Sequence, residues 1–312
     1  SGCLGVSILV VGSTHMDFYI VAPRLPQPGE TIKGGAFFVR PGGKGANQAV
    51  GCARLGATVY LVSAVGKDHL GLSAIEALKS AGVVVDYVYV DESRHTGTAF
   101  IILSKETGEN MIVVAPGADE SVRPTHVDRA LADISHSVKI VLVQLEIPME
   151  TVYYTLRAGK KLGATTILNP APAQHIDETA LKYVDVITPN RVEASQLSGV
   201  EVRDVDSAFK AGEEIIRKGP KIAAVTLGAL GVAVVTHNRR FHVPAYRVNV
   251  VDSVGAGDAF NSALAVALLE GRDIFEATRF ATAAAALKTT RVGAQSVPTR
   301  QEVEDLMRYG GV

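Results

Sequence analysis

The sequence lacks the features that mark several common classes of protein. Its 312 residues include only two cysteines, Cys3 and Cys52, which form neither a CxxC pair nor another metal-binding spacing. No apolar run approaches the roughly 18 residues of a membrane span. No basic leader precedes the apolar stretch near the N-terminus, so no signal peptide is visible. With so few cysteines, a reduced, cytoplasmic setting is the default expectation.

An excess of charge of one sign is also missing. The formal net charge is −1, and the basic residues are spread along the chain, which argues against nucleic acid as a main partner. The histidines show no HxxxH or HExxH spacing, and no GxSxG motif supports acyl transfer. With 47% hydrophobic and 20% charged residues, the chain can fill a substantial core.

Short β-branched runs alternate with helical patterns over most of the length. The strands read as continuous apolar runs, which predicts a mainly parallel sheet covered by helices on both faces, an α/β doubly wound fold. We expect strands at 7–11, 58–65, 140–144, 165–168, 184–188 and 222–227, and a hairpin at 234–244. We expect helices at 46–55, 72–81, 149–162, 191–197, 207–218 and 281–287.

Two segments, 29–43 and 96–117, break this rhythm and read as strand–turn–strand, the second with a hairpin loop at 105–108. We expect them to form a small β-sheet lid, built from insertions at about 17–41 and 94–117 in a single domain that spans 1–312. Such a lid excludes water from a reacting phosphate. Its exposed edge is a pairing hazard, which a homodimer formed through two lids would cover.

The stretch VNVVDSVGAGDAFNSALAVALLEG carries the most chemical information. An apolar run stops at Asp252, turns through Gly255-Ala256-Gly257 and meets Asp258 at the start of a helical segment. Small residues expose backbone N–H groups, and the helix N-terminus adds partial positive charge, so the turn suits the charge of a transferred phosphoryl group. Asp258 can then accept the proton of an attacking hydroxyl, although it can equally well be a simple helix cap.

Other candidate ligands follow the predicted strands. In an open α/β sheet, ligands bind at the carboxyl ends of strands. The glycine-rich start of a helix in PGGKGANQAVGCARLGA suits several neighbouring hydroxyls, as on a sugar, and a purely structural loop-to-helix junction is the alternative. From the residues alone, the candidates to contact such hydroxyls are the backbone at Gly43 and the side chains of Asp17, Asn47 and Glu146.

A second group of candidates suits a nucleotide. Asn190 and Glu193, three residues apart at a strand-to-helix junction, can orient the water shell of Mg²⁺. By itself this pattern is better explained as a helix N-cap with an acidic first turn. Residues 226–231, TLGALG, end a predicted strand with two glycines, which is consistent with a nucleotide lying against the backbone.

Two signatures, GGKGANQAVGCARLGA and VDSVGAGDAFNSALA, are highly specific, and their order and separation also agree with one family. The sequence resembles the ribokinase-type sugar kinases, also called PfkB carbohydrate kinases, from about Ile8 to Val303. The resemblance implies that Asp258 is the catalytic base for a primary hydroxyl. It implies that Gly255, Ala256 and Gly257 form the anion hole.

The same resemblance assigns the ligands. The sugar would be held by Asp17, Gly43, Lys44, Asn47, Glu146 and Asp258. ATP would lie along Asn190, Thr226, Leu227, Gly228, Ala229, Leu230, Gly231, Gly257 and Thr282, with Mg²⁺ near Asn190 and Glu193. K⁺ would lie beside the anion hole, mostly on backbone oxygens, at Asp252, Val254, Lys288, Arg291, Gly293 and Ser296.

The sequence therefore predicts ATP-dependent phosphorylation of D-ribose at its 5-hydroxyl. His15 stands where the family often has an asparagine that touches the sugar, which leaves 2-deoxyribose, a nucleoside or another sugar open. Base selectivity also stays open, because Thr282 lies near the expected adenine. From a different class, a sugar-binding regulator without catalysis is the remote alternative. Retention of Asp258, the glycine turn and the NxxE motif argues against it.

Overall fold

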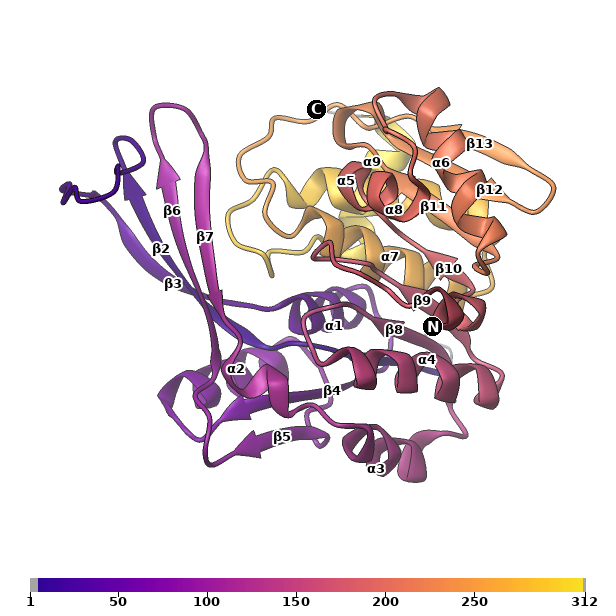
Figure 1. Cartoon of the computed structure of the whole chain (residues 1–312), viewed down its shortest axis with the longest axis horizontal. Helices are drawn as coiled ribbons and strands as arrows, with labels where there is room; N and C mark the ends of the chain where they lie inside the picture. The colour runs from indigo at the N-terminus through magenta and orange to yellow at the C-terminus, as the bar shows by residue number, and fades with distance from the viewer. Residues whose placement is uncertain (1–4, 311–312) are drawn as a thin grey trace.

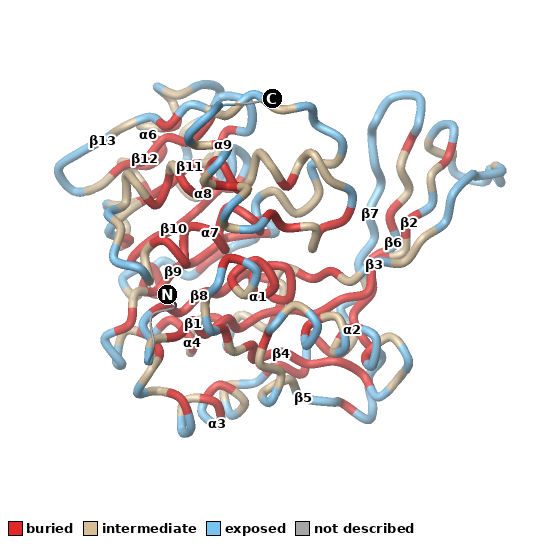
Figure 2. Tube along the Cα trace, turned by 180° about the vertical axis from the view of Figure 1, so that it is seen from behind, coloured by how far each residue is buried: buried red, intermediate tan, exposed pale blue. Residues whose placement is uncertain are grey.

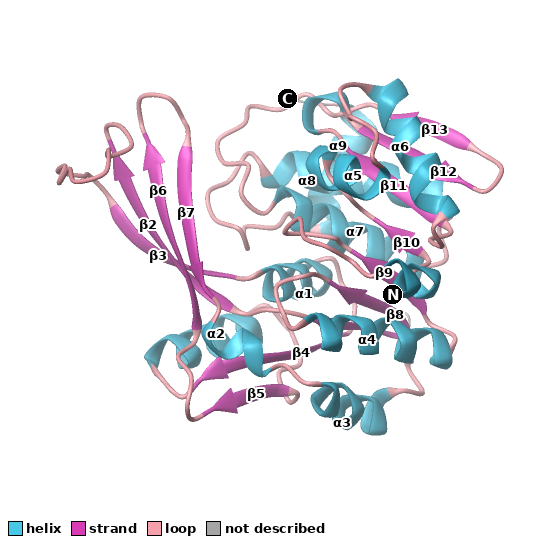
Figure 3. Ribbon diagram, in the orientation of Figure 1, coloured by secondary structure: helices cyan, strands magenta, loops and turns pink. Residues whose placement is uncertain are grey.

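The computed structural model describes residues 5–310, in which a large sheet forms the body and a small sheet stands to one side (Figures 1 and 3). Cys3 and the chain ends lie outside the described residues. The large sheet runs in the order β13 (Arg240–Val243), β12 (Val232–Thr236), β11 (Ile222–Thr226), β10 (Val186–Ile187), β9 (Thr165–Leu168), β8 (Val138–Val143), β1 (Ser7–Val11), β4 (Val59–Gly66) and β5 (Val88–Asp91).

Helices cover both faces of this sheet, as predicted. They are α1 (Lys44–Arg54), α2 (His69–Ser80), α3 (Pro124–Ile134), α4 (Met149–Leu162), α5 (Arg191–Ser198), α6 (Val205–Arg217), α7 (Ala256–Leu269), α8 (Ile274–Lys288) and α9 (Arg300–Tyr309). Alternate residues of β1 divide between two cores: Ile8 and Val10 pack with α1, α7 and α8, and Leu9 and Val11 pack with the α3 to α6 side. The buried centre of the sheet is continuous in Figure 2.

The strand pairing confirms the predicted fold class. Pairs from β5 across to β11 are parallel, and only the β11–β12 and β12–β13 pairs are antiparallel. The chain winds in opposite directions on the two sides of β1 and β8, so the sheet reverses its order between these two strands. A crevice at the carboxyl ends of such strands is where open α/β sheets bind ligands.

The small sheet forms the expected lid, in the order β3 (Phe37–Gly42), β2 (His15–Ala22), β6 (Gly97–Ser104) and β7 (Asn110–Ala115). The hairpin in 96–117 is confirmed, with its turn after Ser104. The strand–turn–strand reading of 29–43 is wrong: this segment supplies only β3, which pairs with β2. Several glycines and prolines between residues 26 and 35 keep the residues before β3 out of the sheet.

Several other expectations need correction. Asp17 does not end the first strand of the main sheet; it lies in lid strand β2, which follows β1 after three intervening residues, Gly12 to Thr14. The prediction missed β5, α3 and α9, and β10 is shorter than the predicted 184–188. The helix predicted at 281–287 begins earlier, at Ile274, where Asp273 caps it. Within residues 5–310, no helix has both the length and the apolar character needed to cross a membrane.

Candidate active site

The start of α7 has the shape of an anion hole. Gly255 precedes the helix with a φ of 83° and no side-chain cap, so the first N–H groups of α7 are left without a side-chain acceptor. A Cβ on Gly255 would lie 2.7 Å from the carbonyl oxygen of Ala294, so both the backbone angle and the space require glycine. These donors and the helix dipole favour an anion at this point.

Asp258 lies in the first turn of α7 but does not cap it, so its interpretation as a simple helix cap is wrong. Its buried carboxylate instead accepts hydrogen bonds from two side chains of α1, 2.8 Å from Asn47 Nδ2 and 3.0 Å from Gln48 Nε2. A carboxylate held by two amides in this way keeps one orientation. The helices approach closely because a Cβ on Gly51 of α1 would meet Ser262 Oγ of α7 at 2.2 Å.

Gln48 continues a chain of buried amides that the sequence analysis did not assign to the site. Its Nε2 also donates to Asn169 Oδ1 at 3.0 Å, and its Oε1 accepts from Gln144 Nε2 at 2.5 Å. Asn169 and Gln144 follow β9 and β8, so strand ends position the amides that position Asp258. The position of Gln48, next to Asn47 in the predicted motif, was the available signal.

The charges around Asp258 balance one another. Burial raises the pKa of Asp258, while the Lys44 ammonium and the two amide hydrogen bonds act to lower it. Burial acts to lower the pKa of Lys44, but the carboxylates of Asp258, Glu146 and Glu193 outweigh burial and raise it. Lys44 is therefore a cation that the carboxylates of Asp258, Glu146 and Glu193 stabilise.

Two of the predicted sugar ligands carry buried oxygens with no hydrogen-bond partner within residues 5–310: Asp17 Oδ1 and Asn47 Oδ1. A buried acceptor without a donor costs about 1–3 kcal/mol, so such atoms need an explanation. Burial raises the pKa of Asp17 to about 6, and the nearby carboxylates of Glu146 and Asp258 add to the rise. Gly42 makes room for this side chain, since a Cβ there would lie 2.0 Å from Asp17 Oδ2. These two oxygens lack hydrogen-bond donors, and the hydroxyl groups of a ligand are donors of the right kind.

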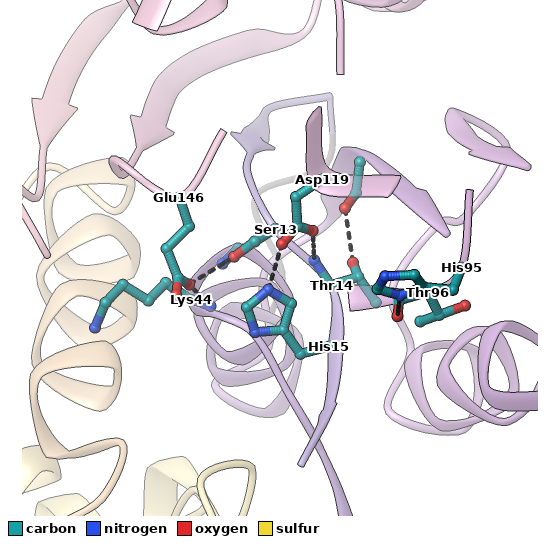
Figure 4. Close-up of polar contacts among 10 residues, drawn as sticks. Ser13, Thr14, His15, Lys44, His95, Thr96, Asp119 and Glu146 are labelled. Atoms are coloured by element: carbon teal, nitrogen blue, oxygen red, sulfur yellow. Dashed lines mark hydrogen bonds and ion pairs between the residues drawn. The ribbon is translucent and has the colours of Figure 1, made fainter. Parts of the chain in front are cut away.

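Glu146 closes the same group from the end of β8 (Figure 4). Its Oε1 accepts from Ser13 Oγ at 2.7 Å and from the backbone N–H of Lys44 at 2.9 Å. Burial acts to raise the pKa of Glu146, but His15, Lys44 and the hydrogen bonds lower it. The α1 N-terminus, which starts after Gly43 with a φ of 89°, is thus fixed by a carboxylate.

His15 forms a buried ion pair with Asp119, a residue that the sequence analysis missed (Figure 4). Burial acts to lower the pKa of His15, but Asp119 outweighs it and the pKa rises to about 9. Burial raises the pKa of Asp119 to about 6 in spite of His15. At neutral pH both side chains are therefore charged. The pair borders a cavity of about 580 Å³ that Arg94, Arg123 and Glu146 also line.

Asn190 and Glu193 form a capping box at the N-terminus of α5. Asn190 Oδ1 accepts from the N–H of Glu193 at 2.9 Å, and Glu193 Oε1 accepts from the N–H of Asn190 at 3.0 Å. The N-cap interpretation is confirmed. The residues also fit Mg²⁺, which keeps several waters and needs only one or two carboxylates beside the phosphates of a substrate. Burial raises the pKa of Glu193.

The predicted nucleotide segment follows β11 as a tight loop. The N–H of Leu227 donates to Gly231 O at 2.8 Å, and Gly228–Leu230 form a single 3₁₀ turn. Gly231 has a φ of 86°, and a Cβ there would lie 2.0 Å from Val243 O. Thr282 is buried in α8 and donates its hydroxyl to Thr278 O at 2.7 Å. The predicted nucleotide residues are therefore held by backbone hydrogen bonds and by side-chain hydrogen bonds within one helix.

Of the six residues predicted to hold K⁺, five lie in two loops joined by hydrogen bonds, and Lys288 ends α8. Asp252 Oδ1 accepts from the N–H of Val254 at 2.9 Å, and Oδ2 accepts from the N–H of Gly293 at 3.0 Å. Ser296 Oγ donates within its own loop, to Val292 O. Lys288 Nζ donates to Asp252 O at 3.1 Å and to Arg291 O at 3.0 Å. Burial lowers the pKa of Lys288, and Asp252 opposes this shift.

A buried acid beside an N–H-lined helix start is the arrangement of a phosphotransferase that acts on a hydroxyl group. Comparison with known proteins narrows this class. The model of the pfkB family of carbohydrate kinases matches residues 6–300, and the chain belongs to this family. It is a carbohydrate kinase.

Similar proteins carry more specific names. The chain is 40% identical over 304 residues to a ribokinase of Haemophilus influenzae, covering 97% of this chain and 99% of that protein. It is 35% identical to a deoxyribokinase of Salmonella typhimurium, covering 93% and 95%. The structure of Arabidopsis thaliana ribokinase complexed with ribose and ATP superposes with a TM-score of 0.91 at 34% identity, covering 98% of this chain and 100% of that one.

Proposed function

We propose that this protein transfers the γ-phosphoryl group of ATP to the 5-hydroxyl of D-ribose. The observation that carries the proposal is the pair of buried acceptors, Asp17 Oδ1 and Asn47 Oδ1, that lack partners among residues 5–310. Both residues belong to the charged group around Asp258, and sugar hydroxyls supply the missing donors. The ribokinases among the relatives, one of them solved with ribose and ATP, support the choice of sugar and donor.

In the proposed mechanism, Asp17, Asn47 and Glu146 orient the sugar so that its primary hydroxyl meets Asp258. Asp258 accepts the proton of that hydroxyl as the oxygen attacks the γ-phosphorus. The N–H groups after Gly255 stabilise the charge on the transferring group, and this stabilisation supplies most of the rate enhancement. The lid, which carries Asp17 on β2, excludes water when the sugar draws it over the site.

ATP is proposed to lie along the loop Thr226–Gly231 with its phosphates toward the α7 N-terminus. Mg²⁺ bound near Asn190 and Glu193 would neutralise charge on the phosphates. A structural relative solved with ATP and Mg²⁺ shares the fold at 23% identity. The resemblance also implies a monovalent cation, but the Lys288 ammonium already contacts two of its expected oxygens, so the proposed mechanism does not include that ion.

A second candidate substrate, 2-deoxyribose, is favoured by the His15–Asp119 pair. The pair places charge at the position where an asparagine is expected to touch the sugar, and one changed polar partner can decide specificity. A deoxyribokinase is also among the relatives, at 35% identity.

One assay tests the function and separates the candidates. ADP release is coupled to a spectroscopic readout with ribose, 2-deoxyribose, fructose 6-phosphate and adenosine as acceptors. We expect the largest kcat/KM for ribose. A larger value for 2-deoxyribose would transfer the proposal to that sugar, and no ADP release with any acceptor would favour the non-catalytic regulator.

We also propose a homodimer through the lid and a location in the cytoplasm. One lid face exposes apolar side chains that a partner lid would cover, including Phe37, Phe100, Met111 and Val113. Phe18 stacks on Phe100 with ring centroids 5.0 Å apart, so these two rings have fixed positions on that face of the lid. Sedimentation of a monomer at micromolar concentration would contradict the dimer. The buried, free thiol of Cys52 fits a reducing compartment.

A further inference from the structure

Lys288 is the most unusual charged residue of the structure. It ends α8 and is fully buried, with a relative exposure of 0%, and no other Lys or Arg within residues 5–310 is fully buried. A buried ammonium is costly unless hydrogen bonds replace its water. Its Nζ donates to the carbonyl oxygens of Asp252 and Arg291, at 3.1 and 3.0 Å. Two backbone carbonyl oxygens therefore hold the ammonium in one position.

The position of the Lys288 ammonium coincides with the predicted K⁺ site. Asp252 and Arg291 are two of the six positions that the family resemblance assigns to the ion, and the ammonium takes up both of their carbonyl oxygens. Backbone carbonyl oxygens that solvate K⁺ can solvate an ammonium equally, since it offers three donors to such oxygens. Two cations in one cage would repel each other. The residues present do not fit a bound K⁺.

We propose that the Lys288 ammonium is a built-in monovalent cation, which makes this kinase independent of K⁺. The side chain would hold together the two loops that frame the anion hole, 252–254 and 291–296. These loops are already linked by the Asp252 carboxylate, which accepts from the N–H groups of Val254 and Gly293. Ala294 of the second loop packs directly on Gly255.

Lys288 would thus be a positioning residue that acts through the loop before α7. The ammonium keeps the carbonyl oxygens of Asp252 and Arg291 turned toward one another. With the carbonyl groups fixed, the peptide planes between Asp252 and Gly255 are fixed as well, and so is the direction of the following N–H groups. The effect of Lys288 on catalysis rests on the function proposed above. Its occupation of the K⁺ site does not.

The wild-type protein gives the first test. Thermal unfolding is measured in KCl and in tetramethylammonium chloride at equal ionic strength, and crystals are soaked in Tl⁺, an electron-dense ion that mimics K⁺. We expect the same Tm in both salts, equal rates of ADP release, and no Tl⁺ at the oxygens of Asp252 and Arg291. A higher Tm in KCl, or Tl⁺ on these two oxygens, would overturn the proposal.

Two variants sharpen the test. Lys288→Ala opens the cage, so K⁺ should enter it: we expect Tl⁺ at the two carbonyl oxygens and a Tm about 2–4 °C higher in K⁺ at about ten times its Kd. Its rate should fall on the order of tenfold or more and recover in K⁺. The matched variant Lys288→Met fills the same space without charge, and K⁺ should restore neither its Tm nor its rate.

Each result decides the matter without reference to the sugar. A Lys288→Ala protein that binds no Tl⁺ and shows no response to K⁺ would reduce Lys288 to a structural side chain and end the proposal. If both variants fail to fold, the wild-type measurements still decide it. If no sugar is phosphorylated but the Tm and Tl⁺ results are as expected, the built-in cation stands and the proposed function fails.

Discussion

The two sides of the α7 N-terminus are built in different ways. On the proposed sugar side, side chains from separate parts of the chain converge, and two of their buried oxygens have no partner within residues 5–310. We define this side by Asp17, Asn47, Glu146 and Asp258. A set of side chains with unmet hydrogen bonds is complete only with a ligand, so this side selects its substrate by chemistry.

On the proposed nucleotide side, the Asn190 and Glu193 side chains already have hydrogen-bond partners within the chain. We define this side by Asn190, Glu193 and the loop 226–231. Its side chains bond within one helical turn, and Gly231 shapes the loop at a point where a Cβ does not fit. Such a side binds mainly through backbone and shape, so single substitutions there should cost less than on the sugar side. The Lys44 ammonium is influenced by carboxylates of both sides, Asp258 and Glu146 on one and Glu193 on the other.

The largest effect is expected for Asp258→Asn. The amide cannot accept a proton, so kcat should fall about 10²- to 10⁴-fold, the usual contribution of a general base. Asparagine keeps the size of the side chain, and we expect Tm to change little. The measurement is steady-state ADP release with the best sugar. Asp206→Asn, an exposed change on α6, is the matched control and should keep full activity. Near wild-type turnover in Asp258→Asn would remove the base from the mechanism.

The next effect concerns the His15–Asp119 pair and pH. The pKa of His15 is about 9 in the folded protein against 6.5 for an exposed histidine, so the folded state binds more protons between these values. Its stabilising contribution is complete below pH 6.5 and is lost as pH rises through 9. The shift corresponds to about 3 kcal/mol, so the free energy of unfolding should decline by about that amount from pH 6.5 to 9.

Urea denaturation at several pH values measures this decline. The double variant His15→Asn/Asp119→Asn replaces the ion pair by neutral amides and serves as the control, because it should lose the decline but stay folded. Either single variant leaves one buried charge unpaired and should be less stable than the double. Equal pH profiles for the wild type and the double variant would contradict the assignment.

Asp17→Asn should act on the sugar alone. A charge-assisted hydrogen bond is roughly twice as strong as a neutral one, so kcat/KM for the sugar should fall about tenfold or more. The KM for ATP should not change, because Asp17 lies on lid strand β2, away from the nucleotide side. Substrate titrations at saturating ATP and at saturating sugar separate the two. A change confined to the KM for ATP would contradict the comparison of the two sides.

The sequence predicted the body of the fold well because its signals are local. Continuous apolar runs predicted the parallel strands, and glycine-rich turns before α1 and α7 marked the site. The predictions failed where pairing is not local. Residues 12–17 were taken as the end of the first strand and β2 was not predicted as a strand, because nothing in its own sequence shows that its partner β6 lies 82 residues later.

The same limit explains the residues missed at the site. Asp119 meets His15 across 104 positions of the chain, and Asn169 meets Gln48 across 121. Each has a spacing that no motif encodes. Lys288 shows the opposite case: its position was predicted through the family, but because mostly backbone oxygens were expected to matter there, the role of its ammonium was missed. The contacts of a long side chain are set by the fold and not by its neighbours in sequence.

The smallest effect is expected on the nucleotide side, for Asn190→Ala. Loss of the α5 cap should lower the free energy of unfolding by about 1 kcal/mol and leave the KM for the sugar unchanged. Asn190→Asp keeps the cap and should restore the stability. If the capping box also orients Mg²⁺, only the alanine variant should need a higher Mg²⁺ concentration for half-maximal rate. Titration of Mg²⁺ at fixed ATP measures this. A sugar KM that rises in Asn190→Ala would mean that the two sides are coupled, because a residue that completes only its own helix turn cannot reach the sugar through local bonds.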